Sequence, residues 1–172
     1  QTVATADYGE GKVASFRVLE DGGIDGPVSL VQHEGSSIDE KRQTSPHAHC
    51  VIPSQDGKYI YSADLGTDSI HLYEVGEGGS ISVHAGQPVL KVTHLGGGPR
   101  HFAIHPSLPV AFTNLELTSE VTAFEFDRAA GTLAESVTIS TLPGEVEKNS
   151  TSEVLIHPNG QFLYCANRGH NS

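Results

Sequence analysis

The chain has 172 residues, 37% of them hydrophobic, and a formal net charge of −11, because 21 acidic residues stand against 10 Lys and Arg. This length suits one core and one domain, and the acidic balance argues against a nucleic-acid partner, since no cationic field would neutralise phosphates. The sequence contains no run of about 18 apolar residues and opens with no secretory signal, so it predicts a cytoplasmic protein without a membrane partner.

Short β-type runs recur along the chain. They include residues 58–63, 69–75, 121–126 and 161–166, which are rich in Val, Ile, Tyr, Phe and Thr and are separated by Gly, Pro, Asn and Asp. Helical periodicity is hard to find, so the sequence predicts an all-β fold. Cys50 and Cys165 fall within similar runs, which favours small buried thiols over a disulfide.

An internal repeat of about 50 residues is the decisive pattern. Residues 46–53 read PHAHCVIP, residues 99–106 read PRHFAIHP and residues 151–158 read TSEVLIHP, so the closing prolines are 53 and then 52 residues apart. Each copy is followed by a turn, a second strand and an Asp or Asn, namely Asp64, Asn114 and Asn167. A period of this length with about four short strands is typical of a β-propeller blade.

The repeat divides the chain into parts of a propeller with four-stranded antiparallel blades. Residues 1–30 are expected to end one blade, 46–95 and 99–141 to form two blades, and 151–172 to begin another. This amounts to about three to three and a half blades, whereas a closed ring needs at least about four. The chain is therefore expected to be an incomplete ring, or to be completed by a second copy in a homodimer.

Antiparallel geometry brings four reactive side chains to one rim of the predicted propeller. His47 and Arg100 each follow the proline that opens a repeat, and Glu116 and Arg168 lie just past the Asn that ends a second strand. The start of a first strand and the end of a second strand emerge on the same side of a blade, so these residues are expected to meet at the channel mouth.

Each residue also has a plainer interpretation. His47 and His49 share one strand face and would need Glu116 as a third metal ligand, so no metal site is predicted. In the plainer interpretation, Arg100 only pairs with Glu116, and residues 168–171 form a polar turn. The glycines at 96–98 would turn the chain tightly into the next blade.

Three segments resemble the lactonase-type seven-bladed propellers, the family of the propeller 6-phosphogluconolactonases and the fungal carboxy-muconate lactonizing enzyme. They are SPHAHCVIPSQDGKYIYSADLGTDSIHLYEV (45–75), GPRHFAIHPSLPVAFTNLELTSEVTAFEFD (98–127) and TSEVLIHPNGQFLYCANRGHNS (151–172). The resemblance covers almost the whole chain, but blades are missing at both ends, and residues 107–109 (SLP) replace the usual Asp-Gly or Asn-Gly turn.

The resemblance implies an active site that contains Arg100, Glu116, Arg168 and a histidine of the Pro-His-x-His run. His47 is preferred because it aligns with Arg100 when the repeats are matched by their prolines, and His49 is the second choice. The neighbouring polar residues are expected to contact substrate: His49, His101, Asn114, Asn167 and His170.

The implied activity is hydrolysis of a sugar-acid lactone such as 6-phosphogluconolactone, a reaction of carbohydrate metabolism that needs no cofactor. Arg100 and Arg168 would bind the small anionic substrate and stabilise the oxyanion, because guanidinium binds carboxylate or phosphate through two parallel bonds. His47 or Glu116 would be the general base, and Glu116 would otherwise orient an arginine.

Two other functions are compatible with the pattern. A cycloisomerase of a carboxy-muconate-type dicarboxylate would use the same arginines. A non-catalytic propeller would instead bind protein through exposed aromatic and apolar side chains, but the predicted rim is charged and rich in histidine.

Overall fold

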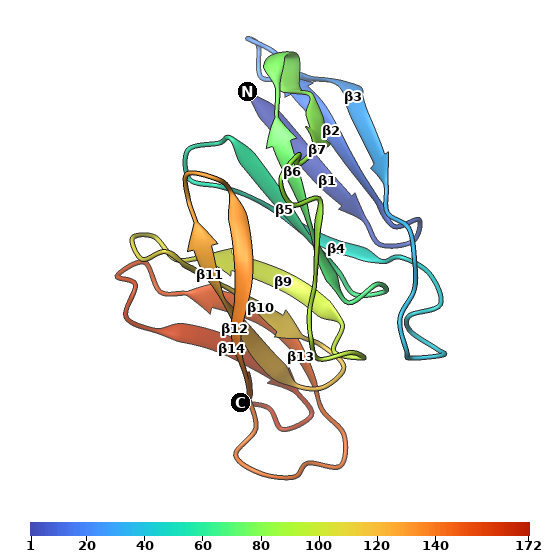
Figure 1. The fold of residues 1–172 in the computed structure, drawn as a ribbon, viewed down its shortest axis with the longest axis vertical. Helices are drawn as coiled ribbons and strands as arrows, with labels where there is room; N and C mark the ends of the chain where they lie inside the picture. Colours follow the sequence, from blue (N-terminus) through green and yellow to red (C-terminus); the bar gives the residue numbers. More distant parts are fainter.

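Fourteen β-strands and one turn of 3₁₀ helix make up the computed structural model, which describes residues 1–172. The strands form four antiparallel sheets that follow one another in chain order, with the two termini at opposite ends of the molecule (Figure 1). The expected all-β propeller architecture is confirmed. None of the elements is a helix with the length and hydropathy needed to cross a bilayer.

The first sheet has three strands in the order β1-β2-β3. They are β1 (Thr2–Asp7), β2 (Lys12–Val18) and β3 (Ile24–Gln32). A tight turn joins β1 to β2, and its Gly11 has φ +64°, a backbone conformation that L side chains rarely adopt. In this sheet β1 pairs only with β2, so its other edge is unpaired.

The second sheet is a blade whose fourth strand is broken in two. Its members are β4 (Ala48–Pro53), β5 (Tyr59–Asp64), β6 (Ser69–Val75), the 3₁₀ turn η1 (Glu77–Gly79), β7 (Ile81–Val83) and β8 (Val89–Lys91). β7 pairs with the second half of β6, and β8 pairs with its first half. The two short strands together occupy the outer position of the blade.

The third sheet is a regular four-stranded blade, and the fourth is a hairpin. The third contains β9 (Pro99–Ile104), β10 (Val110–Leu115), β11 (Glu120–Asp127) and β12 (Thr132–Ser140), and the fourth contains β13 (Ser150–Ile156) and β14 (Leu163–Arg168). β10 alternates partly exposed Val110 and Phe112 with buried Ala111 and Thr113, the period of two expected for a strand packed on one face.

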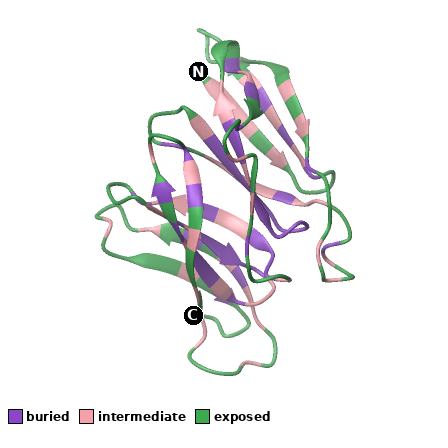
Figure 2. Cartoon of the chain, in the orientation of Figure 1, coloured by how far each residue is buried: buried purple, intermediate pink, exposed green.

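The hydrophobic core lies between neighbouring sheets. The larger cluster joins the second and third sheets, where the Tyr61 ring stacks on Phe102 at 5.4 Å between ring centroids and meets Phe126 edge-on at 5.7 Å. A smaller cluster around Val13 and Tyr73 joins the first and second sheets. Each blade thus buries its apolar faces only against its neighbours, and Figure 2 shows the buried residues concentrated in the middle of the molecule.

The strand register corrects the alignment of His47 with Arg100. Val51 pairs with Ser62, the fourth residue of β5, and Phe102 pairs with Thr113, the fourth residue of β10. Val51 and Phe102 are therefore equivalent, and Arg100 corresponds to the residue two before Val51. That residue is His49. The proline-based alignment was wrong because β4 extends through Pro53, whereas β9 ends at Ile104, two residues before the proline of its repeat.

Candidate functional site

The side chain of Glu116 is the centre of a cluster of three arginines. Its carboxylate is only 7% exposed. Arg100 Nε lies 2.9 Å from Glu116 Oε2, Arg168 Nη2 lies 3.2 Å from the same oxygen, and Arg42 Nη2 lies 2.9 Å from Glu116 Oε1. The structure therefore brings together three of the four predicted catalytic residues and adds Arg42.

The backbone of Glu116 is fixed between two blades. Its N–H donates to the carbonyl oxygen of Gly98 at 2.9 Å, and its own carbonyl accepts from the N–H of Thr151 at 3.2 Å. Gly98 opens the third blade and Thr151 belongs to β13 of the fourth. The carboxylate consequently projects from the point where the blades that carry Arg100 and Arg168 meet.

The charge of Glu116 is held by the arginines. Burial alone would raise its pKa, but the hydrogen bond and charge of Arg42, together with the charges of Arg168 and Arg100, bring the pKa below the usual value. Glu116 is therefore an ionised acceptor at neutral pH. Because both oxygens already accept hydrogen bonds, its role in this structure is to position the guanidinium groups.

Arg100 is the most deeply placed of the three cations, with a side chain 17% exposed. Its Nη1 donates to the backbone carbonyl of Ser152 and lies 3.1 Å from His101 Nε2. On the other side of the same imidazole, His101 Nδ1 lies 2.6 Å from Glu153 Oε1. Arginine has no acceptor, so His101 Nε2 accepts from Arg100, and the proton of neutral His101 lies on Nδ1.

Arg168 and Arg42 are more open to solvent, with side chains 48% and 42% exposed. Besides Glu116, Arg168 Nη2 contacts the carbonyl of Thr151 at 2.9 Å, and Arg42 Nη2 lies 3.3 Å from the hydroxyl of Tyr8. In both side chains only Nη2 makes these contacts, so other N–H groups remain available to a ligand. Three cations around one anion leave a formal local charge of +2.

His47 belongs to the same rim through Tyr8. Its Nδ1 lies 2.8 Å from the carbonyl oxygen of Tyr8, and its ring stacks on the Tyr8 ring at 4.4 Å between centroids. A carbonyl only accepts, so Nδ1 carries a proton. In the neutral imidazole, the lone pair is then on Nε2. The hydroxyl of the same Tyr8 accepts from Arg42, which connects His47 to the Glu116 cluster.

His49 faces Arg100 and His101 from β4. Burial, followed by the positive charge of Arg100, lowers its pKa to about 4, so the imidazole is neutral at pH 7. Its ring meets those of Tyr8 and His101 edge-on at 5.4 and 5.3 Å. Its Nδ1 is buried and has no hydrogen-bond partner. His49 thus supplies a neutral, poorly basic wall to the site.

Asn114 and Asn167 make their hydrogen bonds within the protein, and their predicted contact with substrate stays a prediction. Asn114 is fully buried; its Oδ1 accepts from the N–H of His101 at 3.0 Å and its Nδ2 donates to the hydroxyl of Thr151 at 2.8 Å. Asn167 is buried between Thr141 and Asn149 and bonds to both. Their amides are occupied by the protein, so they hold loops in place.

His170 lies outside the arginine cluster. It is exposed, its N–H donates to Oδ1 of Asn149 at 3.0 Å, and its Nδ1 lies 2.9 Å from the hydroxyl of Ser172. The structure shows no contact between His170 and any of the three arginines. Its predicted contact with substrate stays a prediction.

Arg42 was missed by the sequence analysis because it lies outside the repeat. It belongs to the loop between β3 and β4, which lies outside the three aligned repeat segments. The available signal was its position, four residues before the Pro-His-x-His run, in a polar segment that must pass over the rim.

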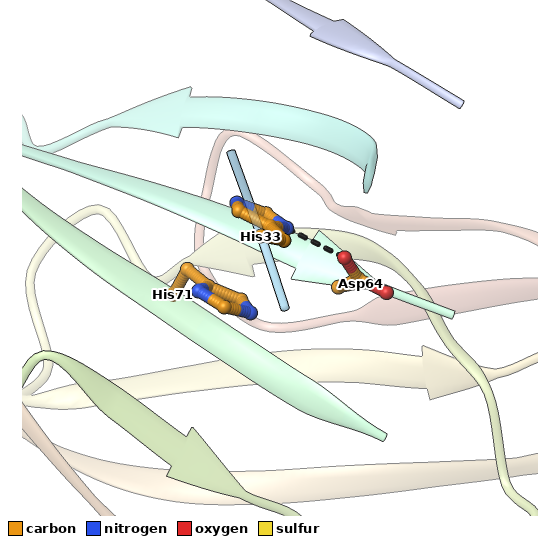
Figure 3. A group of neighbouring side chains, drawn as sticks. All are labelled: His33, Asp64 and His71. Carbon is orange, nitrogen blue, oxygen red and sulfur yellow. Dashed lines mark hydrogen bonds and ion pairs between the residues drawn. The ribbon is translucent and has the colours of Figure 1, made fainter. Parts of the chain in front are cut away.

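A second cluster of His33, Asp64 and His71 has ligand atoms within 4.8 Å of one another (Figure 3). His33 Nδ1 lies 2.5 Å from Asp64, and His33 Nε2 lies 2.5 Å from the hydroxyl of Tyr73. The imidazoles of His33 and His71 stack at 3.5 Å with an interplanar angle of 4°. Nitrogen lone pairs lie in the ring plane, so two parallel stacked rings do not point at one ion. The arrangement suits a buried hydrogen-bond network that joins the first two sheets.

Comparison with known proteins gives one consistent result. The family model described as "Lactonase, 7-bladed beta-propeller" matches residues 1–172. A 6-phosphogluconolactonase of Bacillus subtilis is 37% identical over 100% of the chain, which spans 48% of that protein. The crystal structure of a periplasmic gluconolactonase from Pseudomonas aeruginosa superposes with a TM-score of 0.89 at 28% identity, over 99% of this chain and 48% of that one. A structure from Lactobacillus plantarum gives a TM-score of 0.90 at 28% identity, with the same coverage.

Proposed function

Because the chain belongs to the seven-bladed β-propeller lactonase family, we propose that its site, within a completed ring, hydrolyses a sugar-acid lactone such as 6-phosphogluconolactone. The observation that carries this proposal is the convergence of Arg42, Arg100 and Arg168 on Glu116. A local excess of positive charge would capture an anionic substrate that the chain's net charge of −11 would otherwise repel.

The arginines suit the chemistry of ester cleavage. Water attacks the lactone carbonyl carbon, the carbonyl oxygen becomes an oxyanion, and the bond to the ring oxygen breaks as that oxygen takes up a proton, giving the open hydroxy acid. We assign oxyanion stabilisation to Arg100, because bonds to Glu116 and Ser152 hold its guanidinium in place before the reaction. Arg168 would grip the sugar-acid portion.

His47 is the general base in this proposal. With a proton on Nδ1 and the carbonyl of Tyr8 to orient the ring, the neutral imidazole keeps Nε2 free to accept a proton from water. Such a base contributes roughly 10²–10⁴-fold in rate. The alternatives are weaker: the pKa of His49 is lowered to about 4, and Glu116 already accepts from Arg42 and Arg100 and lies 3.2 Å from Arg168. No step requires a cofactor, and a cytoplasmic location stays a prediction.

The test is lactone hydrolysis by the purified protein and two variants of Arg100. After correction for spontaneous hydrolysis, Arg100→Ala should lower kcat/KM for 6-phosphogluconolactone at least about a hundredfold, because the oxyanion loses its fixed donor. Arg100→Lys keeps the charge but loses the planar fork, and should also be strongly impaired.

The matched control is Arg17→Ala, which removes an exposed arginine whose salt bridge is to Asp25 on the first sheet and not to any residue of the site. Circular dichroism would establish that each variant is folded. Unchanged turnover in Arg100→Ala would remove Arg100 from the mechanism, and turnover of a carboxy-muconate without turnover of lactones would contradict the proposal.

A further inference from the structure

Arg42 differs from the other two arginines in where it comes from and what it contacts. It is supplied by the loop between β3 and β4, and it alone approaches Glu116 Oε1, whereas Arg100 and Arg168 share Oε2. Arg42 therefore lies across the carboxylate from the other pair. A ligand group that contacts Arg42 would be displaced from one held between Arg100 and Arg168.

The loop that carries Arg42 is rigidly built. Oδ1 of Asp39 accepts the backbone N–H of Lys41 and of Arg42, at 2.8 and 2.9 Å. The neighbouring Gln43 is fully buried and donates to the carbonyl of Leu65 at 2.8 Å and to Oδ1 of Asp68 at 2.7 Å. Because the segment around Arg42 is tied down, the loop does not have to become ordered when the guanidinium of Arg42 binds a ligand.

The donors of Arg42 are not used up. Its Nη2 serves both Glu116 Oε1 and the hydroxyl of Tyr8, and neither its Nε nor its Nη1 bonds to the protein. In Arg100, by contrast, Nε donates to Glu116, and Nη1 donates to His101 and to Ser152. The Tyr8 hydroxyl accepts from Arg42 and still has its own proton to donate. Arg42 and Tyr8 thus present several donors to an acceptor-rich group.

We propose that Arg42, with Tyr8, binds the phosphate of a phosphorylated lactone and sets the preference of the site for phosphorylated over unphosphorylated sugar acids. A phosphate dianion matches the formal +2 excess of the cluster and offers three acceptor oxygens to the guanidinium and phenol donors. This assignment rests on the proposed lactonase function, because it places the phosphate relative to the arginines that bind the lactone end.

The proposal is tested by equilibrium binding of the two hydrolysis products, 6-phosphogluconate and gluconate, measured by isothermal titration calorimetry. Arg42→Ala should weaken 6-phosphogluconate binding at least about tenfold, since a charge-assisted hydrogen-bonded pair is lost, and should change gluconate binding less than about twofold. The affinity of Arg42→Lys for 6-phosphogluconate should lie between those of Arg42→Ala and the unmodified protein. Tyr8→Phe should weaken only the phosphorylated product, and Arg17→Ala should bind as the unmodified protein does.

Equal weakening of both products by Arg42→Ala would overturn the proposal, because it would mean that Arg42 only supports Glu116. An unmodified protein that binds 6-phosphogluconate no better than gluconate would overturn it as well. A different result would contradict the proposed lactonase function: the protein would bind 6-phosphogluconate but would not hydrolyse the corresponding lactone.

Discussion

The carboxylate of Glu116 accepts from Arg42 through one oxygen and from Arg100 through the other, which also lies 3.2 Å from Arg168 Nη2. Three guanidinium groups at this separation would repel one another without it, and each would then move toward solvent. Breaking a buried ion pair by removing one partner typically costs about 3–5 kcal/mol, because the remaining charge is left uncompensated. Glu116 is therefore needed both to assemble the site and to stabilise the junction of the third and fourth blades.

Glu116→Gln should lower the free energy of unfolding at pH 7 by about 3 kcal/mol, measured by urea denaturation. The pKa of Glu116 is lowered in the folded state, so its contribution is present above the ordinary glutamate pKa of 4.5 and is lost as pH falls through the folded value. The difference between wild type and Glu116→Gln should therefore shrink on acidification below about pH 4.5. Glu125→Gln, at an exposed position on β11, is the control, and a difference that stays constant down to low pH would contradict this account.

Residue spacing was enough to predict the contact of Arg100, Glu116 and Arg168, because equivalent positions of successive blades emerge on one rim. It was not enough for His47 and His49, since matching the prolines hid a shift in strand register. Arg42 was out of reach for a different reason. A loop outside the repeat has no equivalent position from which its place in space follows.

At the scale of the elements, the first two sheets are joined by buried polar groups as well as by apolar contacts. Asp64 ends β5, and its two oxygens serve different purposes. Oδ2 lies 2.5 Å from His33 Nδ1, while Oδ1 accepts the backbone N–H of His47 at 2.9 Å and of Thr67 at 3.0 Å. The same carboxylate thus anchors the segment after β3 and the start of the Pro-His-x-His run.

His71 should make the protein sensitive to acid. Burial, followed by the charge of His33, lowers its pKa to about 3, with Lys91 adding a smaller effect of the same sign and Asp64 opposing it. An unfolded chain binds this proton near pH 6.5, so stability falls as pH drops from about 6.5 toward 3. His71→Phe keeps a planar ring stacked on His33. It loses no hydrogen bond at Nε2, because Nε2 of His71 has no hydrogen-bond partner.

We expect His71→Phe to reduce the slope of unfolding free energy against pH between pH 6.5 and 4. The reduction should be as much as about 1.4 kcal/mol per pH unit, the value for the uptake of one proton on unfolding. The measurement is urea denaturation across that range. His49→Phe is a useful comparison, because its pKa is also lowered, to about 4, by burial and by Arg100. A slope unchanged in His71→Phe would show that this histidine titrates alike in the folded and unfolded protein.

The repeat predicted antiparallel sheets that follow one another along the chain, and the structure shows that succession. The break of the outer strand into β7 and β8 was not predictable in the same way. These two segments have three residues each and pair with opposite halves of β6. A segment of three residues is too short to show a hydrophobic periodicity. The outer strands face solvent, and packing constrains their sequence least.

At the scale of the whole molecule, the chain spans about half the length of the curated relatives it matches. Its last sheet is only a hairpin, and apolar side chains of this hairpin are exposed, among them Leu155 on β13 and Tyr164 on β14. We propose that further blades cover these residues and close the ring, supplied either by more of the same polypeptide or by a second copy of this chain. A solution mass of two chains would support the second copy.

The measurement that tests the account most directly is a crystal structure of the protein with bound 6-phosphogluconate. The account predicts a ring of blades whose mouth holds the product, with its carboxylate on Arg100 and Arg168 and its phosphate against Arg42. Product bound elsewhere, or arginines that turn away from Glu116 and from the ligand, would contradict it.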